Sequence, residues 1–528
     1  MYDLIIKNGK IVDGTGNPWF YADIGIKDEK IAAIGNLSST EAKRVLDASD
    51  HVVSPGFIDV HAHGADQLLS FPTADAKIRQ GVTTMLDGNC GISVAPLNEF
   101  GKPIMQSHGI ESDCATLDEF FTQLETIGTA INVASLVGNG TVRACVVGVS
   151  DKKPTEAQMQ QMKSLVDEAM AHGAMGLSTG LVYPLSGYAD KQEIIKLCEV
   201  AAKHGGFYAS HVRTMGHLLF EAVAEGLDIG RQAGLPVQIS HLLAGPPQWG
   251  RLPELMGLLE RARSEGMDVT TDNVVYRYSG FEGGSLLPLW ATEGGMEKLI
   301  QRINNSETRE KIKADTREIG DRKGGSVAAC LMEKGEWDNI WLYLPERLRG
   351  KTIADLAAET GVTDPYDVLL DLIVQEKGAI QGRTEPMSQV DIDYTTHHPL
   401  CMLISDGWPS KRGGFTVMHT FGSFGKVFGE YVRDRGVVRL EEAVRKCTSF
   451  PAQRMGLRDR GQIKEGYFAD ITIFNPDTVK EKGTFDNPEQ HPDGFTWVLV
   501  NGKVVLDNGE HTGVLPGKAL RRNLLTLG

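Results

Sequence analysis

The sequence predicts an α/β protein, a (β/α)8 TIM barrel with a small β-sandwich domain formed from both termini. Alternating apolar and polar residues fill residues 1–55 in short runs and return after residue 456, which is typical of antiparallel strands. Between these ends, about eight short apolar segments alternate with helix-period stretches, as in a barrel. A chain of 528 residues is long enough for one large domain and a smaller unit.

The two ends of the chain share one strand pattern. Near the start, apolar runs are separated by the turn signals Asn8-Gly9 and Asp13-Gly14. The same pattern returns at residues 469–474 and 497–505. We therefore expect residues 1–55 and 456–528 to complete one β-sandwich.

Residues 56–455 are predicted to form the barrel. Its eight strands are expected to end near His63, Asn89, Val137, Ser178, His211, His241, Asp272 and Asp406. Helices are predicted between strands at residues 155–172, 189–204 and 218–233. Gly234 follows the last of them as a C-terminal cap. A segment from about 280 to 400 fits no single βα unit, so we predict a helical insertion over the active site.

Composition excludes several classes of function. The 54 Lys and Arg against 69 Asp and Glu give a net charge of −15, which opposes binding to nucleic acid or an anionic lipid surface. No apolar run suits a membrane span and no secretory signal begins the chain, so a cytoplasmic location is expected. The seven cysteines are scattered, which disfavours a disulfide framework. We expect a small-molecule partner; a homo-oligomer stays open.

Polar residues at strand ends carry the chemistry, because the active site of a βα barrel lies at the carboxyl ends of its strands. His61 and His63 are two residues apart after the first strand, on one face, where both can bind one metal ion. His211 and His241 end the fifth and sixth strands, and Asp406 ends the eighth. Each residue alone is more often structural, but together at one rim they predict a metal site.

This constellation resembles the amidohydrolase superfamily of metal-dependent TIM-barrel hydrolases. Many of those enzymes bridge two metals with a carboxylated lysine on strand four, whereas residues 173–180 of this chain contain no lysine. The element Gly88-Asn89-Cys90-Gly91 resembles instead the N-acyl-D-amino-acid deacylases (D-aminoacylases), where a cysteine after strand two takes that place. Residues 173–184, 404–407 and 500–517 resemble the same family, so the resemblance spans nearly the whole chain.

The resemblance implies a zinc site, because zinc accepts mixed sulfur, nitrogen and oxygen ligands. His211, His241 and Cys90 would hold one tightly bound ion. A second position, whose occupancy stays open, would be defined by His61, His63, Asp406 and the shared Cys90.

The implied reaction is the hydrolysis of a non-peptide amide C–N bond, giving a carboxylate and an amine. Metal-activated water would be the nucleophile, and Asp406 would act as general base and then general acid. Tyr183, after strand four, is a candidate hydrogen-bond donor to the oxyanion. Packing under the rim is an equally good interpretation of that tyrosine.

Substrate recognition departs from the family pattern. The family lysine two residues after the strand-six histidine is replaced by Leu243, and its His-Pro-Arg element is replaced by His419-Thr420-Phe421. Burying a carboxylate without a cation costs several kcal/mol, so we expect an amide or N-acyl substrate with a less acidic recognition group. Tyr276, after strand seven, is a further candidate for substrate binding. The candidate replacement cations are Arg213, Arg277, Lys411 and Arg412.

Two alternative functions remain on the sequence alone. One is a cyclic amidase or deaminase from elsewhere in the superfamily, acting on a substrate without a free α-carboxylate; Cys90 and the lysine-free strand four argue against it. The other is a catalytically inactive binding or scaffold protein, which the retained metal ligands disfavour.

Overall fold

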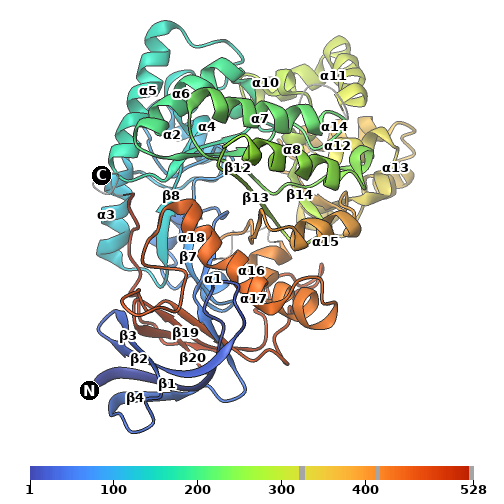
Figure 1. Ribbon diagram of the computed structural model, residues 1–528. Coiled ribbons are helices and arrows are strands. Elements are labelled where there is room, and N and C mark those ends of the chain that lie inside the picture. Colours follow the sequence, from blue (N-terminus) through green and yellow to red (C-terminus); the bar gives the residue numbers. More distant parts are fainter. Residues whose placement is uncertain (320–326, 411–416, 523–528) are drawn as a thin grey trace.

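The computed structural model describes residues 1–319, 327–410 and 417–522. A parallel βα barrel stands at the centre of the molecule (Figure 1). A β-sheet domain built from both ends of the chain lies at one end of the barrel, and the insertion between β13 (Val269–Asn273) and β17 (Cys401–Leu403) lies at its side. The predicted fold class, a TIM barrel with a terminal β-sandwich, is confirmed. None of the helices in the described part of the chain is long and apolar enough to cross a membrane.

The barrel strands are parallel and follow one another in chain order. They are β6 (Phe57–Asp59), β7 (Val82–Asp87), β8 (Asn132–Ser135) continued by β9 (Val137–Gly138), β10 (Gly176–Gly180), β11 (Phe207–His211), β12 (Val237–Ile239), β13 (Val269–Asn273) and β17 (Cys401–Leu403). The ring closes just beyond β17, where Asp406 N–H donates to His61 O and His63 N–H to Gly407 O, both at 3.1 Å. The first and last strands therefore meet at the predicted metal ligands.

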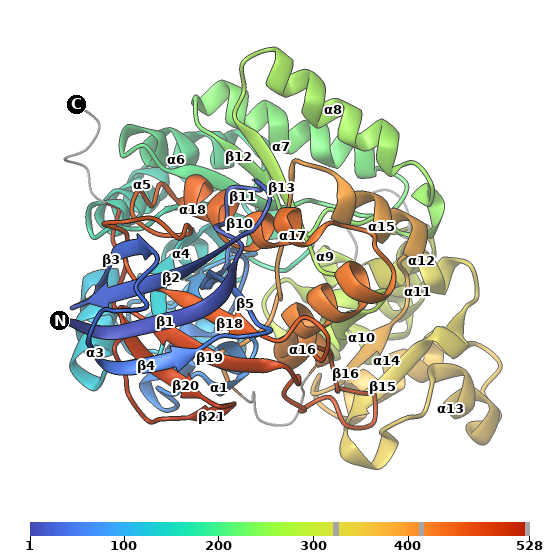
Figure 2. The same ribbon diagram turned by 60° about the horizontal axis from the view of Figure 1, so that its bottom comes forward.

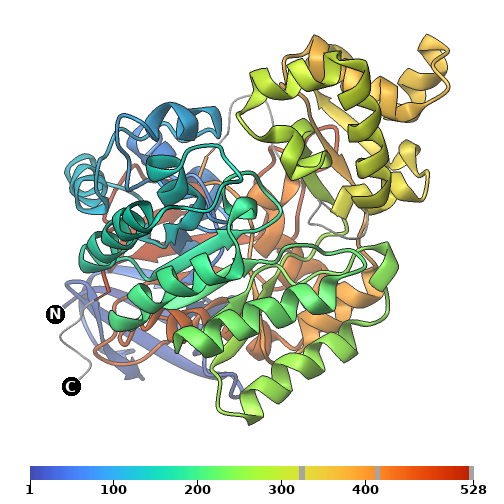
Figure 3. The same ribbon diagram turned by 90° about the horizontal axis from the view of Figure 1, so that it is seen from above.

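Helices cover the outside of the barrel (Figure 3). The predicted helices appear as α5 (Glu156–Ala171), α6 (Lys191–Lys203) and α7 (Leu219–Ala233), and Gly234 caps α7 with a φ of 72°. The other helices of the barrel are α1 (Asp75–Ile78), α2 (Lys102–Ser107), α3 (Leu117–Ile127), α4 (Asn139–Val146), α8 (Leu252–Ser264), α15 (Gln389–His397), α16 (Met418–Lys426), α17 (Leu440–Cys447) and α18 (Ser449–Met455).

Both ends of the chain share one nine-stranded sheet (Figure 2). Its strands are β1 (Tyr2–Ile11), β2 (Phe20–Lys27), β3 (Lys30–Gly35), β4 (Ala42–Asp47), β5 (Val52–Pro55), β18 (Ile471–Phe474), β19 (Phe495–Val500), β20 (Lys503–Asp507) and β21 (Glu510–His511). The antiparallel pair β5 and β18 joins the N-terminal half to the C-terminal half. Apolar side chains from both halves form one buried cluster, so neither half buries its apolar face alone.

The insertion has its own apolar core and differs from the helical segment that the sequence predicted. It contains β14 (Ser279–Glu282), α9 (Leu289–Thr292), α10 (Met296–Asn304), α11 (Ser306–Ile319), α12 (Val327–Glu333), β15 (Ile340–Leu344), α13 (Ile353–Thr360), α14 (Pro365–Gln375) and β16 (Gln381–Thr384). The three strands form an antiparallel sheet. Sequences such as Ser-Gly-Phe-Glu and Gln-Gly-Arg-Thr show no apolar alternation, so periodicity alone does not reveal β14 or β16. The following helix, α15, packs on β17 and α8 of the barrel.

Candidate metal centre

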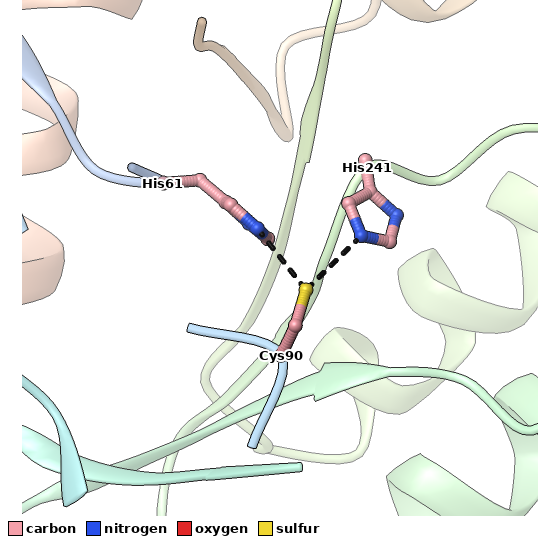
Figure 4. A group of neighbouring side chains, drawn as sticks. All are labelled: His61, Cys90 and His241. Carbon is pink, nitrogen blue, oxygen red and sulfur yellow. Dashed lines mark hydrogen bonds between the residues drawn. The ribbon is translucent and has the colours of Figure 1, made fainter. Parts of the chain in front are cut away.

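Cys90 lies among three histidines at the carboxyl ends of the barrel strands. Its Sγ is 3.4 Å from His61 Nε2, 3.5 Å from His241 Nε2 and 3.6 Å from His211 Nδ1. Figure 4 shows the rings of His61 and His241 directed at the sulfur. All four side chains are buried, so any ion that they bind would be shielded from bulk water.

A second group of ligand atoms adjoins the first. Asp406 Oδ1 lies 3.0 Å from His63 Nε2 and 3.4 Å from His61 Nε2. His61 thus belongs to both triads whose ligand atoms lie within 4.8 Å of one another, one with Cys90 and His241 and the other with His63 and Asp406. His63 and Asp406 are only partly buried, so the second group is the one that faces the open rim.

The residues present fit a divalent cation. Burial alone would raise the pKa of the Cys90 thiol, but His61, His211 and His241 around it hold that pKa well below its usual range. Burial likewise opposes ionisation of Asp406, yet its bond to His63 and the imidazole charges keep its pKa well below that of an ordinary carboxyl. A thiolate, a carboxylate and four imidazoles form the mixed donor set that suits zinc.

Strand β10 holds the loop that carries Cys90. Gly91 N–H donates to Ser178 Oγ at 3.0 Å, and the same hydroxyl donates to Gly88 O. A Cβ atom on Gly180 would lie 2.2 Å from Cys90 O, so only glycine permits this approach. The lysine-free strand four is therefore the element that fixes the cysteine loop in place.

Three candidate ligands have left-handed backbone conformations, with φ of 52° at Cys90, 30° at His241 and 52° at Asp406. Such conformations cost about 1–3 kcal/mol each and persist only where surrounding contacts hold them. For His241 that contact is a 2.6 Å hydrogen bond from its N–H to Asp272 Oδ1. The strand ends are therefore shaped to turn these three side chains toward one point.

Of the other predicted site residues, Tyr183 lies next to a candidate ligand, whereas Arg213, Arg277 and Leu243 are paired, exposed or buried in the core. Tyr183 lies beside His211, with ring centroids 5.0 Å apart. Arg213 is already paired with Glu225 at 2.9 Å and donates to two backbone carbonyls, so it is not a free cation. Arg277 is exposed on the loop after β13, and Leu243 is buried in the apolar core.

Tyr276, another predicted site residue, contacts a distant segment of the chain. Tyr276 is buried, and its hydroxyl donates to Glu481 Oε1 at 2.6 Å. Glu481 comes from the segment between β18 and β19, a contact that no local pattern indicates. Lys411 and Arg412 lie outside the described residues.

Sequence reasoning missed the buried polar groups beneath the ligands. Asp272 ends β13 and contacts two candidate ligands. Lys77 forms a fully buried ion pair with Asp59 at 2.7 Å and donates to Ser405 Oγ at 2.6 Å, which ties β6 to the chain just after β17. In the sequence, Asp272 is recognisable only as a strand end, and Lys77 and Asp59 only as charged residues in apolar segments. Neither observation identifies their partners.

Several known proteins are similar to this chain in sequence and in fold. The Amidohydrolase family model matches residues 44–285 and 404–506. A D-aminoacylase from Alcaligenes xylosoxydans xylosoxydans is 34% identical over 525 residues, covering 99% of this chain and 98% of that protein. A solved D-aminoacylase structure with a binuclear metal center has a TM-score of 0.82 at 32% identity, covering 99% of this chain and 100% of that chain. An N-acyl-D-glutamate deacylase from Bordetella bronchiseptica, complexed with zinc and a phosphonate mimic of the tetrahedral intermediate, has a TM-score of 0.82 at 31% identity, covering 98% and 99%.

Proposed function

This chain belongs to the N-acyl-D-amino-acid deacylase (D-aminoacylase) family of the amidohydrolase superfamily, and we propose that it hydrolyses an amide bond. The proposed substrate is an N-acyl-D-amino acid or a related N-acyl compound, and the proposed cofactor is zinc. The observation that carries the proposal is the meeting of Cys90 with three histidines at the carboxyl ends of the barrel strands.

The tighter ion would be held by Cys90, His211 and His241, and His61, His63 and Asp406 would define a second position. The related structures with a binuclear metal center and with bound zinc support the proposal that zinc binds here and that a second metal position exists. When bound, zinc lowers the pKa of water towards neutrality and polarises the amide carbonyl.

Asp406 is the proposed proton carrier. Its pKa lies well below that of an ordinary carboxyl despite burial, because of the bond to His63 and the charges of His61 and His241. Asp406 is therefore in the ionised form that a general base needs, and in the proposed role it accepts a proton from the attacking water and passes it to the leaving nitrogen. Its position at the partly open rim gives a substrate access to it.

Tyr183 is the proposed hydrogen-bond donor to the oxyanion. Burial, with the negative charges of Cys90 and Asp406, raises its pKa well above that of an ordinary tyrosine. The hydroxyl therefore keeps its proton. A donor held in place before the reaction stabilises negative charge that develops in the transition state.

For the substrate, we propose an N-acyl compound with a less acidic recognition group than the family norm. Leu243, where the family has a lysine, is apolar and buried, and Arg213 already neutralises Glu225. A substrate carboxylate beside these two residues would lack a cationic partner, at a cost of several kcal/mol.

The substrate proposal is tested by steady-state assays of the zinc-loaded protein. N-acetyl-D-amino acids are compared with their neutral amides and with cyclic amides. We expect the neutral compounds to have the higher kcat/KM. A clear preference for the free acids would contradict the less acidic recognition group, and turnover of cyclic amides alone would favour a cyclic amidase.

The catalytic proposal is tested with Asp406→Asn. We expect kcat to fall by roughly 10²- to 10⁴-fold, while metal analysis still finds zinc bound through Cys90, His211 and His241. Asp391→Asn is a matched control, because Asp391 is also a buried carboxylate that accepts a backbone N–H, from Gly250. Full activity in Asp406→Asn would rule out this aspartate as the proton carrier.

A further inference from the structure

Asp272 is a fully buried carboxylate at the end of β13, beside the candidate metal centre. The two nitrogens of the His61 ring have different neighbours. Nε2 lies 3.4 Å from Cys90 Sγ, and Nδ1 lies 3.4 Å from Asp272 Oδ1. Asp272 thus contacts a proposed ligand through the nitrogen that the metal would not use.

The carboxylate of Asp272 has two further partners. Oδ1 accepts the backbone N–H of His241 at 2.6 Å, and Oδ2 accepts from Gln238 Nε2 at 2.5 Å. Together with the contact to His61, these bonds join strands β12 and β13 to the segment just after β6. One side chain therefore touches two of the proposed ligands without contacting a substrate.

A histidine ligand needs one nitrogen free to face the metal, and its other N–H usually donates to a carboxylate or carbonyl that sets the tautomer and the ring orientation. His61 Nδ1 is buried and makes no hydrogen bond among the described residues, and the carboxylate facing it is that of Asp272 at 3.4 Å. Asp272 is the acceptor within reach of it. At His241 the same carboxylate holds a backbone with a φ of 30°.

We infer that Asp272 is a positioning residue of the metal centre, which fixes the ring of His61 and the backbone of His241 so that Nε2 of both faces Cys90. The inference rests on the proposed metal-dependent function. It predicts that Asp272 raises the affinity for zinc without taking part in the chemistry.

The test is Asp272→Asn in the full chain. Asparagine keeps the shape and can still accept from His241 N–H, and the Gln238 amide can rotate to present its oxygen, which has no hydrogen-bond partner in the described structure. The change therefore removes chiefly the negative charge facing His61. Zinc affinity of the metal-free protein is measured by chelator competition, and we expect the Kd of the second position, which His61 helps to define, to rise roughly 10- to 100-fold.

Two comparisons separate positioning from general damage. Asp391→Asn makes the same change at a buried carboxylate that accepts a backbone N–H far along the sequence, and its Kd for zinc should equal that of the wild type. In a His61→Ala background, Asp272→Asn should change the Kd by less than about threefold, because the two residues act as one unit.

Gln238→Met provides a second route if Asp272→Asn does not fold. This variant keeps the carboxylate but removes one of its hydrogen-bond donors, and a smaller rise in the Kd for zinc is expected. Wild-type affinity in Asp272→Asn and Gln238→Met, or an equal loss in Asp391→Asn, would overturn the inference. Failure of the wild type to bind zinc would instead reject the proposed function.

Discussion

Individual side chains at the centre take their chemistry from their neighbours. Burial alone would lower the pKa of His63, yet the bond to Asp406 and the charge of Cys90 raise it to about 9. The pKa values of Asp406 and Cys90 are instead lowered, because the neighbouring imidazoles stabilise their ionised forms. The neighbouring charges thus favour the ionised forms of Cys90 and Asp406 and the protonated form of His63.

Tyr183 provides a prediction at this scale. Tyr183→Phe should lower kcat by roughly 10²-fold with zinc content unchanged, because one donor to the oxyanion is lost. Steady-state kinetics and metal analysis check this.

Tyr188→Phe is the control for Tyr183→Phe, since Tyr188 lies on the same loop and its hydroxyl contacts Leu289 O and Thr292 Oγ1 instead of the candidate ligands. If Tyr183→Phe keeps more than half of the wild-type kcat, packing under the rim is the better interpretation of Tyr183.

Among the elements, the end of helix α15 depends on a side chain from another helix, α17. Lys446 of α17 is fully buried, and its Nζ donates to Thr396 O at 2.8 Å and to His398 O at the end of α15. Burial lowers its pKa from the usual value of 10.5 to about 8. Keeping the Lys446 amine charged in this buried position therefore lowers the free energy of unfolding, although its hydrogen bonds contribute to stability.

This shift predicts a pH dependence of stability. Between pH 8 and 10.5 the unfolded chain keeps its proton on Lys446 and the folded protein has lost it, so the free energy of unfolding rises with pH by up to about 3 kcal/mol. Lys446→Met has no amine at this position and therefore lacks this pH dependence.

The Lys446 prediction is checked by urea unfolding of both proteins at pH 7.5, 9 and 10.5. The stability of the wild type relative to Lys446→Met should increase along this series, while the effects of other titrating groups cancel in the difference. A difference that is constant with pH would show that the pKa of Lys446 is not depressed.

At the scale of the whole molecule, a buried polar network fastens the sheet domain to the barrel. Arg460 is paired with Asp470 and donates to Asn501 Oδ1 at 2.8 Å. Asn501 in turn donates to the Oδ1 of Asn132, on barrel strand β8, at 2.9 Å. Both charged side chains are no more than 5% exposed, so neither can exchange its partner for water.

Arg460→Leu should therefore destabilise the protein by about 3–5 kcal/mol, because the carboxylate of Asp470 is left buried without its partner. Thermal unfolding of the zinc-loaded protein measures this effect. Arg44→Leu is the control, since Arg44 pairs with Asp507 on the exposed surface of the same domain and should cost at most about 1 kcal/mol. Equal shifts in Tm for the two variants would contradict the proposed fastening role.

The fold class and the set of candidate ligands could be predicted from the sequence alone. Strand and helix periodicities follow from local geometry, and His61, His63, His211, His241 and Asp406 stand at strand ends, which a barrel gathers at one rim. Cys90 was identified through its resemblance to the family element. All six residues are found together in the structure.

The partners of those residues could be identified only in the folded protein. Ser178 holds the Cys90 loop, Asp272 faces His61, and Arg213 is already paired with Glu225. A hydrogen bond or ion pair between distant segments depends on distance and burial after the chain has folded. Residue type and spacing do not contain either quantity, so the sequence can name the ligands but not the groups that orient them.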